Sequence, residues 1–336
     1  TETTLVLFPS LLLLSNTVSE WLFDREKEFS FLAVCSDSTV TRGQDSAELS
    51  TSELSYPPTT DPDEIAKFLE SPGRKVVFST YQSSPQIATA MKQHNLPEFD
   101  LILADEAHRC AGKTDSGYGT VLDNGLIPAK HRLFMTATPR VYKTHLRKKA
   151  ADNDIDLASM DDETVFGPVL HKLSFGEAIE LKQLSDYQVV VVGVNNAMVQ
   201  EMVEDRTLVK TETGVEDDAR SLASQIGLAK AIKQYDLKRV ISFHSRVNLA
   251  KNYARDFNQT LDWLREKERP NGKLTYEHVS GAMPTSERIT KLKALGSLKD
   301  QERYILANAR CLSEGVDVPN LDGVAFIDPK RSEIDI

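Results

Sequence analysis

The sequence predicts an α/β protein of two tandem domains, each a mostly parallel sheet with helices on both faces. The chain has 336 residues, which is about two domains by the usual length prior. Short apolar runs alternate with stretches of helical periodicity along both halves, a pattern typical of parallel sheets. The clearest run, Phe99–Ala104, is largely apolar and ends in polar residues, as expected of a strand buried on both faces.

Composition limits the class of protein. Hydrophobic residues make up 40% and charged residues 27% of the chain, as in globular proteins. No apolar stretch approaches the roughly 20 residues that cross a bilayer, and no secretion signal is evident, so we expect a cytoplasmic protein without membrane contact. Cys35, Cys110 and Cys311 are too widely spaced for a disulfide framework or a Cys-x-x-Cys metal site. The net charge of −10 argues against a surface that binds nucleic acid everywhere, but leaves room for a local basic channel.

The expected first domain covers residues 1–146. Its expected strands are 4–8, 30–35, 75–80, 99–104 and 131–136. Helices are expected after Ser10, after Asp61 and over 86–94, with Ser10 as an N-cap. The stretch 36–63 is rich in Ser, Thr and acids and is interpreted as a solvated insertion.

The charged stretch 147–185 is expected to be a linker or surface excursion, and 186–336 to be the second domain. Its expected strands are 187–194, 239–243, 274–279, 304–307 and 324–327, and its expected helices are 222–234, 250–264 and 289–295. The helix from Ala250 to Leu264 places apolar residues three or four apart, which predicts one buried stripe.

Asp105 and Glu106 follow the run Phe99–Ala104 directly and so fall at the carboxyl end of a predicted strand. Open α/β sheets bind ligands at that edge, where one carboxylate can hold Mg²⁺ beside a phosphate and its neighbour can take a proton from an attacking water. The alternative is that the two acids only cap a following helix.

Several short elements together resemble superfamily 2 helicases and translocases, whose two RecA-like domains clamp ATP and track nucleic acid. The resemblance covers nearly the whole chain and follows the family's motif order. The elements that carry it are 5–10 (motif Ia), 77–82, Asp-Glu-Ala-His at 105–108 (motif II), Thr-Ala-Thr at 136–138 (motif III), 241–246 (motif IV), Gly281 with Arg288, and 312–319 (motif V). Within the family, the stretches 61–63, 157–162 and 173–178 look most like the motors of Type ISP restriction-modification enzymes.

The resemblance implies roles for individual residues around ATP and Mg²⁺. Asp105 would hold the metal through water, and Glu106 would orient and deprotonate the attacking water. His108, with Thr136 and Thr138, would couple the nucleotide site to nucleic acid. The residues implied to meet the nucleotide from the second domain are Glu314, Gly315 and Asp317.

The family's nucleic-acid contacts would carry over to the residues Pro9, Ser10, Ser79, Thr80 and Arg246. Such N–H, hydroxyl and guanidinium groups suit phosphates of DNA tracked between the domains. The alternative for these positions is that they are helix caps and strand ends.

Two family elements are absent from the 336 residues. No G-x-x-x-x-G-K-[ST] phosphate loop precedes Asp105, and Gly112-Lys113-Thr114 is a decoy because it follows motif II. The final Gln-x-x-Gly-Arg-x-x-Arg motif is also missing. We therefore expect a piece of a longer motor, inactive as an ATPase alone, whose other domains include a nuclease and a methyltransferase. A repair or RNA helicase and a non-hydrolysing nucleic-acid-binding scaffold remain the alternatives.

Overall fold

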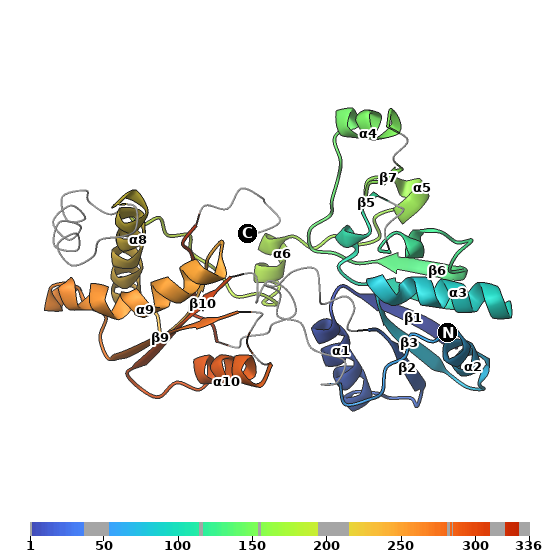
Figure 1. The fold of residues 1–336 in the computed structure, drawn as a ribbon, viewed down its shortest axis with the longest axis horizontal. Helices are drawn as coiled ribbons and strands as arrows, with labels where there is room; N and C mark the ends of the chain where they lie inside the picture. The colour runs from blue at the N-terminus through green and yellow to red at the C-terminus, as the bar shows by residue number, and fades with distance from the viewer. Residues whose placement is uncertain are drawn as a thin grey trace. The chain divides into compact units, whose positions relative to one another are not determined.

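A computed structural model describes residues 2–36, 54–113, 117–153, 156–193, 215–280, 283, 285–309 and 320–328. They form two compact units, the first reaching Ser174 and the second beginning at Phe175 (Figure 1). The main sheet of each unit is parallel and carries helices on both faces. This confirms the predicted fold class.

The sheet of the first unit has the strand order β2-β3-β1-β4-β6. All neighbouring strands in it run parallel. Their bounds are β1 Thr3–Phe8, β2 Ser30–Val34, β3 Lys75–Thr80, β4 Phe99–Ala104 and β6 Ala129–Phe134. The expected strand 131–136 therefore begins and ends two residues earlier, which leaves Thr136 in the loop after the strand.

Helices cover this sheet because its central strands are apolar on both sides. Leu5 and Leu7 of β1 belong to the core beneath α2 (Pro62–Glu70) and α3 (Ser84–His94). Val6 and Phe8 belong to the opposite core, beneath α1 (Leu11–Phe23). The helix starts follow the capping rules, since Ser10 Oγ accepts from Leu13 N at 3.4 Å and Asp61 Oδ1 from Asp63 N at 2.9 Å.

The described residues of 147–174, part of the stretch expected to be a linker or surface excursion, belong to the first unit. β7 (Leu157–Ala158) pairs antiparallel with β5 (Gly112–Lys113), and the segment adds α5 (Glu163–Phe166). Arg147 lies in α4 (Thr144–Ala151), and its guanidinium donates to Tyr142 O at 2.8 Å and to Ser159 Oγ at 2.9 Å. Its charged residues are thus partly used in local ion pairs and hydrogen bonds, which hydrophobic periodicity does not detect.

The second unit has a sheet of strand order β11-β8-β10-β9. Its strands are β8 Arg239–Phe243, β9 Lys273–Val279, β10 Glu302–Asn308 and β11 Gly323–Phe326. Its helices are α6 Phe175–Glu180, α8 Val215–Gln234, α9 Val247–Trp263 and α10 Thr285–Gly296. Residues of α8 and α9 form the core on one face, and Leu295 of α10 lies in the core on the other.

The valine run 189–192 is not in a strand, contrary to the expected strand 187–194, whose last residue lies outside the described part. Strand propensity expresses packing against neighbours, and Val191 here is 93% exposed. Within the described residues, no strand of the second unit pairs with 185–193. Among the same residues, no helix has the length and apolar character needed to span a bilayer.

Candidate functional site

The carboxyl ends of four strands in the first unit meet at one edge of the sheet. Leu7 pairs with Ala104, Phe8 with Thr80, and Ala104 with Phe134, so the strands end nearly level. The residues that follow or end these strands include every first-domain candidate from the sequence. They are Pro9 and Ser10 at β1, Ser79 and Thr80 at β3, Asp105, Glu106 and His108 at β4, and Thr136 and Thr138 at β6.

The turn after β4 is fixed by its backbone. Asp105 N donates to Leu7 O at 3.0 Å, and Ala107 N donates to Met135 O at 2.8 Å. Between them, Glu106 adopts the left-handed conformation, with φ 47° and ψ 45°. A residue other than glycine pays about 1 kcal/mol or more for this conformation, and such residues concentrate at functional sites. The turn therefore holds both acids in a defined arrangement.

The carboxylates in this turn do not act as helix caps. The element that follows is a short 3-10 turn, Ala107–Arg109, and the Glu106 side chain makes no capping hydrogen bond to it. Asp105 Oδ1 instead accepts from the Glu106 backbone N at 2.9 Å. Burial raises the pKa of the Asp105 carboxyl, and the hydrogen bond from Glu106 N opposes that shift. A half-buried acid of this kind fits a ligand site better than a solvated cap.

His108 joins the turn after β4 to the loop after β6. Its Nδ1 atom lies 3.2 Å from Glu106 Oε2 and 3.0 Å from Thr136 Oγ1. Thr138 Oγ1 lies 3.4 Å from the same nitrogen, and Thr138 N donates to Thr136 Oγ1 at 3.1 Å. The side chain of His108 is only 8% exposed, so this contact is shielded from water. The structure thus brings together Glu106, His108 and both threonines.

The remaining candidates of the first unit differ in their access to solvent. Ser10 is half-buried as the N-cap of α1, and Pro9 is buried. Ser79 is fully buried, and its hydroxyl donates to Val34 O at 2.9 Å. Thr80 is also buried and donates to Ser83 Oγ at 3.2 Å. The hydroxyls of Ser79 and Thr80 are therefore used inside the unit and do not face solvent.

In the second unit, Arg246 is exposed and occupies the N-cap position of α9. Two residues separate it from the end of β8 at Phe243. Nearby backbone is held by hydrogen bonds from His244 N to Asn308 O at 2.8 Å and from Ser245 N to Asp328 Oδ2 at 2.6 Å. The candidates Glu314, Gly315 and Asp317, and Gly281, lie outside the described residues.

Sequence reasoning did not single out Tyr81, which belongs to this edge. Its hydroxyl donates to Asp105 O at 2.5 Å, and its side chain is fully buried. The available signal was its position directly after the candidates Ser79 and Thr80. A tyrosine buried at a strand end needs a partner for its hydroxyl, and the neighbouring strand ends supply one.

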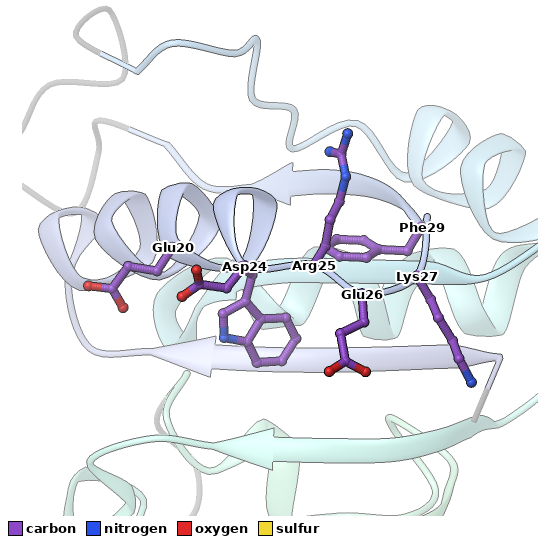
Figure 2. Close-up of a pocket in the computed structure, with 7 residues that line it drawn as sticks. Glu20, Asp24, Arg25, Glu26, Lys27 and Phe29 are labelled. Atoms are coloured by element: carbon purple, nitrogen blue, oxygen red, sulfur yellow. The ribbon is translucent and has the colours of Figure 1, made fainter.

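A shallow pocket of about 460 Å³ lies elsewhere, at the turn between α1 and β2. Figure 2 shows its mostly charged lining, which includes Glu20, Asp24 and Lys27. β2 begins just after this turn, so the pocket lies toward the amino ends of the strands. It is separate from the edge that carries the candidate residues.

Comparison with known proteins agrees with this geometry. Residues 1–141 match the family described as the res subunit of Type III restriction enzymes. Residues 225–336 match the helicase conserved C-terminal domain. The two matches are thus similar to the two halves of a superfamily 2 helicase. The two matches fall on the two units and in the family's order, which confirms the resemblance inferred from the motifs.

Individual relatives place these helicase domains in longer proteins. A probable helicase of African swine fever virus is 28% identical over 339 residues, which cover 99% of this chain and 33% of the viral protein. The structure of the Type ISP restriction-modification enzyme LlaBIII bound to DNA matches with a TM-score of 0.81 and 29% identity, over 99% of this chain and 22% of that one. A nuclease-deletion mutant of LlaGI, another Type ISP enzyme, in complex with a DNA substrate mimic matches with a TM-score of 0.64 and 25% identity, over 100% and 21%. The chain thus spans about a third of the viral relative and about a fifth of the two enzymes.

Proposed function

We propose that this chain is part of the ATP-hydrolysing motor of a DNA helicase or translocase, within a longer restriction-modification protein. The observation that carries the proposal is the cluster at the carboxyl edge of the first sheet, where Glu106 and His108 meet Thr136 and Thr138 beside Asp105. The edge is where parallel α/β sheets bind their ligands. The match of the first unit to a restriction-enzyme subunit and of the second to a helicase C-terminal domain supports the same function.

In this proposal, Asp105 holds Mg²⁺ through water, and Glu106 orients and deprotonates the water that attacks the γ-phosphate. Bound Mg²⁺ would neutralise charge on the phosphates during transfer. The residues fit this ion because Mg²⁺ keeps most of its waters and takes only one or two carboxylates from the protein.

His108 couples the nucleotide edge to nucleic acid through Thr136 and Thr138. A single imidazole nitrogen faces the proposed base and both hydroxyls, so a shift of the loop after β6 would change the position of the Glu106 carboxylate. From the second domain, Glu314, Gly315 and Asp317 would complete the nucleotide site. These roles fall to the unit that reaches Ser174 and to the unit that begins at Phe175.

We further propose that the DNA backbone meets Ser10 and Arg246, whose side chains are at least partly exposed. Pro9 would shape the same loop. Ser79 and Thr80 contribute by fixing the end of β3, since their hydroxyls are satisfied within the unit. DNA as the partner is supported by the LlaBIII and LlaGI complexes, and a restriction enzyme implies nuclease and methyltransferase domains in the same protein.

The test uses the full-length protein that carries this chain. We expect ATP turnover to rise with double-stranded DNA, and ATP-dependent displacement of a third strand from a DNA triplex as the motor advances. Stimulation by RNA alone would favour an RNA helicase instead, and nucleic-acid binding without any turnover would favour a scaffold. The 336 residues alone, which contain no phosphate-loop sequence, should show no DNA-stimulated turnover.

A further inference from the structure

Tyr81 reaches the proposed Mg²⁺ ligand from a strand that is not its neighbour. It begins the 3-10 turn Tyr81–Ser83 directly after β3, and β1 lies between β3 and β4 in the sheet. Its side chain therefore passes the end of β1 before its hydroxyl donates to Asp105 O at 2.5 Å.

This hydrogen bond fixes the peptide that joins Asp105 to Glu106. The carbonyl of that peptide accepts from Tyr81, and its N–H, which belongs to Glu106, donates to Asp105 Oδ1 at 2.9 Å. The orientation of one peptide plane thus sets the rotamer of the Asp105 carboxylate. On the other side of Asp105, its backbone N donates a hydrogen bond to Leu7 O at 3.0 Å and fixes the preceding peptide.

The side chain of Tyr81 is shielded from solvent, so water does not compete for its hydroxyl. Its side chain is fully buried, and the Tyr118 ring packs against it with centroids 5.6 Å apart. Burial raises the pKa of the Tyr81 hydroxyl, so it stays protonated and remains a donor. The buried Cys110 thiol contacts the same hydroxyl.

We propose that Tyr81 is a positioning residue that orients the Asp105 carboxylate toward Mg²⁺–ATP. The proposal rests on the proposed function, because it assigns Asp105 to the metal. Residues that orient a metal ligand typically change metal affinity or activity about tenfold to a hundredfold when they are replaced. Tyr81→Phe removes only the hydroxyl and keeps the ring in the core.

The experiment titrates Mg²⁺ in the DNA-stimulated ATPase of the full-length protein. For Tyr81→Phe we expect the Mg²⁺ concentration at half-maximal turnover to rise about tenfold or more, with a lower kcat. Tyr118→Phe is the matched control, since it removes a hydroxyl that accepts from Gln82 Nε2 and does not touch Asp105. It should leave the Mg²⁺ dependence unchanged. Thermal unfolding of both variants reports any general loss of stability.

An unchanged Mg²⁺ dependence in Tyr81→Phe would overturn the proposal, and so would equal shifts in both variants, because these would indicate a packing effect. Asp105→Asn separates this failure from failure of the proposed function. If Asp105→Asn alters the Mg²⁺ dependence and Tyr81→Phe does not, only the role of Tyr81 is refuted. If neither Asp105→Asn nor Tyr81→Phe alters it, the metal role of Asp105 fails as well.

Discussion

His244 makes the stability of the second unit depend on pH. Its side chain is 3% exposed, its Nε2 lies 3.0 Å from Ser242 Oγ, and its ring packs edge-on against Tyr253 at 4.8 Å. Burial lowers the pKa of His244 to about 4, against an opposing effect of Asp328. In the unfolded chain the pKa returns to about 6.5.

Proton linkage gives the sign and the size of this effect of pH on stability. Because the unfolded state takes up the proton first, the stabilising effect of neutral His244 is complete above pH 6.5 and is lost as pH falls toward 4. Between pH 7 and pH 5 the two pKa values correspond to a loss of about 2 kcal/mol in the free energy of unfolding. His244→Gln keeps a polar partner for Ser242 and removes the titration.

Urea unfolding of the 336-residue chain at pH 5, 6, 7 and 8 measures this. The chain has two tryptophans, so in a Trp21→Phe background the fluorescence of Trp263, at the end of α9, reports the second unit alone. Between pH 7 and pH 5, the free energy of unfolding of the variant should fall by about 2 kcal/mol less than that of the parent chain. Between pH 7 and pH 8, the two free energies should change by the same amount. Equal losses on acidification in both proteins would refute the reasoning.

Two further predictions test local structure and nucleic-acid contact. Asp61→Ala removes the side-chain cap of α2 and should lower the free energy of unfolding of the first unit by about 1 kcal/mol, measured by urea unfolding against exposed Glu70→Ala at the other end of the helix. Arg246→Ala in the full-length protein should weaken DNA binding to a similar degree on unrelated sequences and reduce the slope of log affinity against log salt by about one, measured by fluorescence anisotropy. A loss confined to one DNA sequence, or an unchanged slope, would mean that Arg246 makes no phosphate contact.

The sequence predicted the strands of both parallel sheets to within two residues at each end, but it also predicted a strand where no partner strand is available. β1, β3 and β4 are apolar on both faces, so their position and parallel arrangement followed from the pattern. The valine run 189–192 has equally strong strand propensity and forms no strand in the structure. Propensity describes how a residue packs once a partner strand exists, and it does not supply the partner.

The candidate site shows the same division. The meeting of His108 with Thr136 could be anticipated, because adjacent parallel strands end at one edge. The burial of Ser79 and Thr80 could not, since a hydroxyl at a strand end can face either the solvent or a neighbouring loop. The Tyr81–Asp105 hydrogen bond was also out of reach, because it crosses an intervening strand.

The most direct test of the ATPase assignment is ATP turnover by Glu106→Gln in the full-length protein, with ATP–Mg²⁺ affinity measured in parallel. Glutamine keeps the size of the side chain and an oxygen near His108, leaves the Asp105 carboxylate in place, and removes the base. A positioned general base contributes about a hundredfold to ten-thousandfold in rate, so turnover should fall by that factor while nucleotide binding is retained. Glu163→Gln, an exposed acid in α5, is the control and should keep normal turnover. Near-normal turnover in Glu106→Gln would contradict the role proposed for this edge.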